Sequence, residues 1–229
     1  MDDQTSVSCT DAAATRLDCQ GVSSHNFGSF VFTPVVRALQ ERYGSRRQYA
    51  QLTKASGPPD RLGDEERSFI AERDSVYMAS VGATGWPYIQ HRGGPKGFLK
   101  VIDDRTIAFA DFSGNRQFIS AGNLTTDARV ALILVDYPQQ ARLKILGRAE
   151  ILEGDQATAW IDRVRDPRYK AAIERVFVIH LDAFDWNCPQ HITPRYTAED
   201  IQAAITPLEQ ELQRLQQENE RLRKQLENR

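Results

Sequence analysis

The chain has 229 residues, with 29 lysines and arginines against 31 aspartates and glutamates, and a formal net charge of −2. This balance excludes the strong basic field that favours nucleic acid, so any phosphate site must be local. The apolar fraction of 41% is typical of a soluble protein. No apolar run reaches the roughly 20 residues that a membrane helix needs. We therefore expect neither nucleic acid nor a membrane as partner.

The cysteines and the first residues bear on the compartment. Cys9, Cys19 and Cys188 are odd in number and far apart, which fits neither a disulfide framework nor a closed zinc site. Residues 1–25 are polar and lack the basic-then-apolar order of a signal peptide. We therefore expect a cytoplasmic protein. Because residues 1–25 contain few large apolar groups, we also expect them to form a disordered tail.

Two helices are predicted before the first strand. Thr33 and Pro34 open one of them, with proline at the first helical position and apolar residues at helical spacing over residues 35–43. Residues 54–63 are rich in glycine and proline and indicate a linker, and residues 64–72 indicate a second short helix. We expect the first helix to pack on the domain that follows.

A strand-rich region follows these helices. Its β-prone runs are short and are separated by turn residues, which predicts an antiparallel barrel rather than a parallel sheet. The fold class is therefore mainly β with flanking helices. The expected strands are 75–81, 88–91, 98–102, 106–110, 129–136, 143–152 and 175–181, and the expected later helices are 154–164 and 168–174.

The C-terminal sequence "TPLEQELQRLQQENERLRKQLENR" has the pattern of a coiled coil. Thr206, Pro207 and Glu209 predict the helix start. Asn219 at an a position fixes the register of a parallel two-stranded coil, and Glu218 then faces Arg223 of the partner. The seam residues, spaced alternately by four and three, are Leu208, Leu212, Leu215, Asn219, Leu222 and Leu226.

Two interpretations of residues 197–229 follow from this pattern. One is a parallel homodimeric coiled coil, and the other is a solvated helix that packs back on its own domain. The preceding run "YTAEDIQAAI" is acidic, so the segment is not the zipper of a basic-zipper DNA-binding protein.

The segment "GWPYIQHRGGPKGFLKV", residues 85–101, breaks its own strand pattern. Gly93 and Gly94 add no side chain to a sheet and lie beside His91, Arg92 and Lys96. Such a notch indicates either the close approach of a ligand to the backbone or a bulge that bends the strand.

The run "DFSGNRQ", residues 111–117, has the composition of a phosphate site. Ser113 is placed to cap a following helix, whose free backbone N–H groups attract anions. Arg116 would reinforce them through charge-assisted hydrogen bonds. Alternation places Arg142 and Lys144 on one face of a nearby strand. The other interpretation is that these are solvent-facing charges on a half-exposed barrel.

Residues 78–151, from "MASVGATGWPYIQHRGG" through "DFSGNRQFISAGNL" to "ARLKILGRAEI", resemble the pyridoxamine 5'-phosphate oxidase-like family, the FMN-binding split barrels. The runs "FTPVVRALQERYGSR" and "FDWNCPQHITPR" are similar to an oxidase-related branch of that family. The likeness extends over residues 27–196, so we assign residues 26–196 to the FMN-binding domain. The segments "IQHRGGPKG" and "DWNCPQHITPR" depart from the enzyme that forms pyridoxal phosphate, which argues against that activity.

The resemblance implies a homodimer with FMN in the grooves between the subunits. The FMN phosphate would lie near residues 113–117, with Arg142 and Lys144 on the adjoining strand, and residues 90–94 would run beside the isoalloxazine ring. Trp186 could cover one face of the flavin, and Gln190 or His191 could bond its edge. The candidate cofactor-binding residues are Gln90, His91, Arg92, Gly93, Gly94, Asp111, Ser113, Asn115, Arg116, Gln117, Arg142, Lys144, Trp186, Gln190 and His191.

The expected function is FMN-dependent oxidoreduction with an unidentified small substrate or nicotinamide donor. Because flavin itself carries the hydride, no catalytic acid or base is assigned. Cys188 and His191 supply two ligands at most, so no metal site is expected. The alternatives are a non-catalytic flavin-binding module whose zipper recruits a partner, and a split barrel that binds haem or a deazaflavin.

Overall fold

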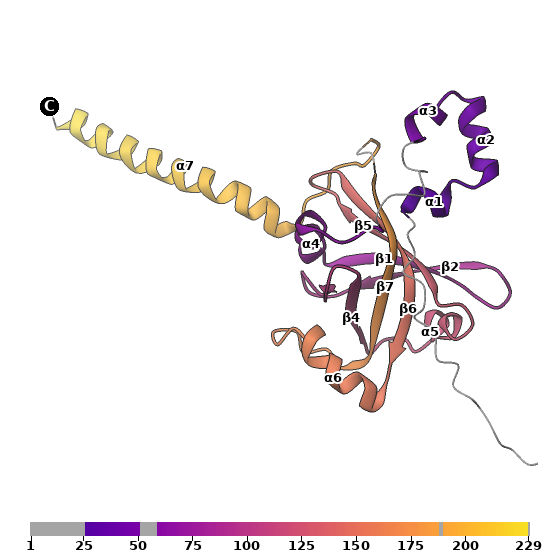
Figure 1. Cartoon of the computed structure of the whole chain (residues 1–229). Coiled ribbons are helices and arrows are strands. Elements are labelled where there is room, and N and C mark those ends of the chain that lie inside the picture. Colours follow the sequence, from indigo (N-terminus) through magenta and orange to yellow (C-terminus); the bar gives the residue numbers. More distant parts are fainter. Residues whose placement is uncertain (1–25, 51–58, 188–189, 229) are drawn as a thin grey trace, which may run out of the picture.

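The computed structural model describes residues 26–50, 59–187 and 190–228. The predicted tail at residues 1–25 and the position of Cys188 lie outside these ranges. One seven-stranded sheet dominates the fold, in the order β2-β1-β5-β6-β7-β4-β3 (Figure 1). All its neighbouring strands pair antiparallel, as the sequence predicted. The strands are β1 (Ser75–Val81), β2 (Pro87–Gly93), β3 (Lys100–Val101), β4 (Thr106–Phe112), β5 (Arg129–Asp136), β6 (Ala141–Leu152) and β7 (Ile173–Asn187).

The sheet curves around one apolar core. Strands β1 and β4 stand near opposite ends of the strand order, yet Met78 and Phe109 belong to the same buried cluster. Arg92 of β2 also forms an ion pair of 2.6 Å with Asp111 of β4, so side chains join the two sides of the sheet. This arrangement is consistent with a split barrel, in which side chains rather than backbone hydrogen bonds span the opening.

Side-chain alternation assigns each strand an inner and an outer face. On β6, Leu143 and Ile145 are fully buried, whereas Arg142 and Lys144 lie on the other face, as predicted. Strand β4 is buried on both faces because helix α6 (Gly154–Val164) packs over its outer side. Phe109 packs in the inner core cluster, and alternation places Asp111 on the same face of β4.

Within residues 26–50 and 59–74, the helices before the sheet are α1 (Phe27–Val31), α2 (Pro34–Arg42), α3 (Arg46–Tyr49) and α4 (Asp64–Ala71). Helix α2 starts as predicted, with Pro34 at its first position and the Thr33 side chain accepting from the Val36 N–H. The Asp60 carboxylate accepts hydrogen bonds of 3.1 Å from the N–H groups of both Phe27 and Phe184. It thereby links the start of α1 to β7.

The helix after β4 begins later than the sequence predicted. Helix α5 (Ile119–Leu124) follows Phe118, which has φ 56° and makes no side-chain cap. Ser113 is not a cap: its hydroxyl donates to Glu174 Oε1 at 3.0 Å. Residues 113–118 form a loop, because Gly114 and two left-handed residues, Arg116 and Phe118, prevent helical geometry there. The predicted helix-start anion cradle is therefore wrong.

The segment after α6 also differs from expectation. Residues 168–172 contain no helix, because Pro167 follows the end of α6 and the chain runs directly into β7. Strand β7 extends well beyond the predicted 175–181, since it pairs with β4 at its start and with β6 along most of its length.

The C-terminal helix α7 (Ala198–Glu227) begins earlier than the predicted start at Thr206. Thr197 and Asp200 form its capping box, so Thr206 and Pro207 lie inside the helix. Figure 1 shows α7 projecting away from the sheet. Among the described residues, no helix combines the length and the apolar character needed to cross a membrane.

Candidate functional site

A cavity of about 270 Å³ opens between β2, β4 and the loop that leads into α5. Its wall is aromatic and its floor is charged. The lining comprises Tyr88, Gln90, His91, Arg92, Gly93, Phe98, Phe109, Ala110, Asp111, Phe112, Gly114, Asn115, Arg116, Gln117, Phe118, Ile119, Ser120, Ala121, Glu174 and Arg175.

Asp111 lies at the floor of this cavity between two arginines. Its Oδ1 pairs with Arg92 at 2.6 Å and its Oδ2 with Arg175 at 2.8 Å. The three side chains are 7%, 15% and 14% exposed, respectively. Asp111 and Arg175 are cross-strand partners on β4 and β7, so the sheet register itself brings them together. Burial lowers the pKa of Arg92, and the Asp111 charge opposes this shift.

The mouth of the cavity carries a second cationic group. The Phe118 ring lies between two guanidinium groups, with Arg175 at 4.9 Å and Arg116 at 5.8 Å from its centroid. Arg116 and Phe118 have φ of 58° and 56°, a region that side-chain-bearing residues rarely adopt. Such strain concentrates at functional sites, where it holds side chains in a required position. Here it turns both side chains toward the cavity rim.

The net charge of the cavity is positive. Arg92, Arg116 and Arg175 contribute three positive charges, against two negative charges from Asp111 and Glu174. The buried Nε of Arg92 has no hydrogen-bond partner among the described residues, although a buried donor is normally paired. An anionic ligand in the cavity would balance this excess positive charge.

The aromatic wall complements this charge. Phe98, Phe109 and Phe112 line the cavity, and Ser120 donates to Gln90 Oε1 at 2.7 Å across its side. Phe98 and Phe109 are only 3% and 1% exposed, so their rings back the cavity, and polar groups form most of its accessible surface. The arrangement can therefore hold an anionic molecule against an aromatic backing.

Comparison with known proteins identifies the family. The sequence profile of the pyridoxamine 5'-phosphate oxidase family matches residues 62–187, more than half of the chain. This chain belongs to that family. The matched range covers the whole sheet and every residue that lines the cavity. A search of curated proteins found no match.

Solved structures show more distant similarity to this member of the pyridoxamine 5'-phosphate oxidase family. An FMN-binding protein from Syntrophomonas wolfei is 17% identical, with 67% of this chain and 97% of that chain covered and a TM-score of 0.40. An F420 reductase is 19% identical, with coverages of 54% and 98% and a TM-score of 0.40. The heme storage protein HutZ from Vibrio cholerae is 16% identical, with coverages of 55% and 94% and a TM-score of 0.37. At these values the family assignment rests on the sequence profile.

Of the fifteen residues predicted for the site, the structure brings eight together around the cavity. The eight are Gln90, His91, Arg92, Gly93, Asp111, Asn115, Arg116 and Gln117. His91 belongs to the lining, but its side chain lies on the outer face of β2, where the centroids of its ring and the Tyr77 ring are 5.4 Å apart. The other seven do not line the cavity: Gly94, Ser113, Arg142, Lys144, Trp186, Gln190 and His191.

Close packing within the chain explains why Gly93 and Gly94 carry no side chain. A Cβ on Gly94 would lie 2.8 Å from Phe98 Cβ and 3.2 Å from Phe112 Cε2, so Gly94 lets the cavity aromatics pack. A Cβ on Gly93 would lie 3.0 Å from His91 Cε1. The β1–β2 register runs without a shift to Gly93, so the predicted alternative of a bulge is wrong there.

Arg142 and Lys144 do not meet the 113–117 loop within one chain. They pair with the end of β7, where Lys144 lies 2.8 Å from Asp185, whereas β4 leads into the loop beside the start of β7. The loop lies beside the start of β7, whereas Arg142 and Lys144 lie beside the end of that strand. A phosphate site that joins these cations to the loop would therefore need a second copy of the chain, as the expected groove between subunits implies.

The late cluster of the sequence also lies away from the cavity. The Trp186 indole N–H donates to Glu66 Oε1 at 2.8 Å, and its ring meets Phe69 of α4 edge-on at 4.8 Å. Gln190 and His191 are exposed beyond the end of β7. Within one chain, Trp186 therefore anchors α4. No cluster of three or more potential metal ligands occurs among the described residues.

Sequence reasoning missed Arg175, Phe118 and Ser120, which all line the cavity. A signal for Arg175 was present, because it alternates with Phe177 and Ile179 and so belongs to the core face of β7. An arginine on a core face must be paired or must bind an anion.

Proposed function

We propose that this protein is an FMN-dependent oxidoreductase that transfers hydride between flavin and a small substrate or nicotinamide donor. The observation that carries the proposal is the net-positive cavity with an aromatic wall, in a chain of the pyridoxamine 5'-phosphate oxidase family. Bound FMN would supply the hydride chemistry at its ring.

The residues of the cavity fit the anionic end of FMN. Arg116, at the rim, is the group that would bind phosphate oxygens, and the charge of Arg92 on the floor would favour an anion in the cavity. Asp111 would hold Arg92 and Arg175 in place, because a buried carboxylate between two guanidinium groups fixes both. Phe98 and Phe112 would exclude water from the ring-binding side.

A second copy of the chain would complete the site. His91, Tyr77, Ile133 and Lys144 form one cross-strand row over the outer face of β2, β1, β5 and β6. Tyr77 is 39% exposed in this row and nearby Ile89 is 62% exposed, so the face offers apolar surface to a partner. We infer that packing on this face brings Arg142 and Lys144 of one subunit toward the cavity of the other.

The deciding experiment identifies the small molecule that copurifies with the protein. Mass spectrometry of the released ligand is expected to identify FMN. The intact protein should then absorb at about 450 nm. Bleaching of this band by NADH or NADPH would support an oxidoreductase. A stable yellow protein that no donor reduces would indicate a flavin-binding module instead, and copurified haem or deazaflavin would overturn the choice of FMN.

A further inference from the structure

Helix α7 carries an apolar stripe that no described residue covers. None of its residues is buried, and Leu208 and Leu226 are 70% and 69% exposed. Helices in proteins gain most of their stability by packing an apolar face, and an internal proline weakens a free helix further. A 30-residue helix with Pro207 inside it therefore needs a partner.

The stripe is longer than the leucine pattern alone predicts. Because α7 begins at Ala198, Ile201 and Ile205 are helical, and they continue the alternating spacing of four and three toward the barrel. Both are exposed, at 49% and 41%. The complete seam is Ile201, Ile205, Leu208, Leu212, Leu215, Asn219, Leu222 and Leu226, which is the a/d pattern of a two-helix coil.

Pro207 does not interrupt this seam. Counted from Asn219 at a, Pro207 occupies a c position, which faces away from a partner helix. Proline lacks an N–H, so the Ala203 carbonyl loses its helical donor, and the Thr206 hydroxyl donates to the neighbouring Gln202 carbonyl oxygen at 2.7 Å. The apolar face of the helix therefore continues on both sides of Pro207.

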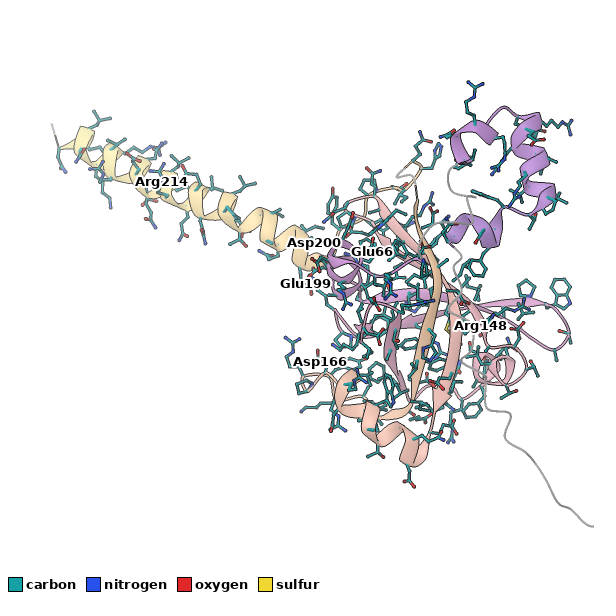
Figure 2. All side chains as sticks on the ribbon, viewed as in Figure 1. Glu66, Arg148, Asp166, Glu199, Asp200 and Arg214 are labelled. Atoms are coloured by element: carbon teal, nitrogen blue, oxygen red, sulfur yellow. The ribbon has the colours of Figure 1, made fainter. Side chains whose placement is uncertain are left out.

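The charges beside the seam complement a second copy of the same helix. Arg214, labelled in Figure 2, lies on α7, where it pairs with Glu211 and Glu218. Arg221 also reaches Glu218. Arg223, at an e position, has no acidic partner in the described chain. In a parallel in-register pair, Glu218 at g faces Arg223 of the other copy.

We propose that α7 pairs with α7 of a second copy, parallel and in register from Ile201 to Leu226. A buried Asn219 pair would select this register and the two-stranded state. The pair places both barrels at the same end of the coil and holds them together whatever ligand the cavity binds. The proposal is independent of the flavin assignment.

Disulfide trapping in the full chain tests the pairing directly. In a background with Cys9, Cys19 and Cys188 changed to serine, Leu215→Cys places a thiol at a d position, where the two copies meet. Lys224→Cys, at an outward f position, is the matched control. We expect on the order of tenfold more cross-linked dimer for Leu215→Cys because only the seam holds its thiols together. Equal cross-linking of the two variants would overturn the proposal.

A charge swap tests the orientation. Arg223→Glu places a carboxylate opposite Glu218 of the other copy, and we expect this repulsion to lower Leu215→Cys cross-linking roughly two- to fivefold. Adding Glu218→Arg restores the opposite-charge pair and should recover the cross-linking. Failure of the swap to recover it, with helicity unchanged by circular dichroism, would contradict the parallel arrangement.

Discussion

At the scale of single residues, the chemistry of the cavity depends on the Asp111 carboxylate. It is 7% exposed and pairs with two guanidinium groups that are nearly as buried. Buried ion pairs add little net stability over apolar residues, but the loss of one member leaves the others uncompensated. Asp111 therefore keeps two arginines buried beside the cavity.

Asp111→Ala is expected to lower the free energy of unfolding by about 3–5 kcal/mol, because Arg92 and Arg175 would remain as adjacent buried cations. Urea denaturation followed by tryptophan fluorescence measures the change. Asp104→Ala is the control: the side chains of Arg61 and Asp104 are 55% and 42% exposed, so loss of this pair should hardly change stability. Equal effects of the two substitutions would show that the buried pairs do not matter.

Arg116→Ala tests the ligand rather than the fold, because Arg116 lies on the exposed rim of the cavity. Loss of one charge-assisted phosphate contact should weaken FMN binding by about 1.5–3 kcal/mol, or roughly 10- to 150-fold in Kd. Titration of the ligand-free protein with FMN measures the affinity. Arg214→Ala, on α7 away from the barrel (Figure 2), should leave it unchanged. An unaltered Kd for Arg116→Ala would show that the FMN phosphate does not contact Arg116.

At the scale of elements, β2 and the turn that follows it fit the aromatic wall closely. Gly94 lies where Phe98 and Phe112 leave no room for a Cβ. The turn after β2 is held by hydrogen bonds from the Gly94 N–H to the Asp74 carbonyl and from the Gly97 N–H to the Arg73 carbonyl. The position of the cavity wall therefore depends on a small residue at one point of the turn.

Gly94→Ala is expected to cost about 1–3 kcal/mol of stability, since the added methyl group would overpack the Phe98 side chain at its Cβ. Thermal or urea unfolding of the ligand-free protein measures this cost. Gly122→Ala in α5 is a matched control, because a Cβ there meets nothing within 4 Å and alanine favours helix. If both variants were equally stable, close packing at residue 94 would be disproved.

At the scale of the whole molecule, two surfaces are suited to a second copy, and they lie on different parts of the chain. The outer face of β1, β2 and β5 would pair the barrels, and the seam of α7 would pair the helices. Two linked contacts strengthen each other because the second forms within an existing complex. Separate removal of each surface therefore distinguishes their contributions.

A chain that ends at residue 196 lacks all of α7 but keeps the sheet and its core. We expect it to remain a dimer that binds FMN, with a larger dimer dissociation constant because the avidity from the coil is lost. Light scattering across a dilution series measures the dissociation. A monomer that still retains FMN would contradict a cofactor site shared between barrels.

The sequence by itself determined the elements whose signals are local. Period-two alternation located the strands and the two faces of β6, and Thr33-Pro34 located the start of α2. The leucine spacing located an exposed apolar stripe on α7, although the predicted start of that helix was wrong because Pro207 resembles a first-turn proline. These features depend on neighbours within a few residues, which sequence patterns record.

Only the tertiary structure decided which distant residues share a site. Arg92, Asp111 and Arg175 come from three strands, and nothing in local periodicity gives the register that joins them. The same register separates Arg142 and Lys144 from the loop they were expected to join. The physical reason is that pairing over a long sheet is set by the packing of the whole core, so residue types and spacings cannot record it.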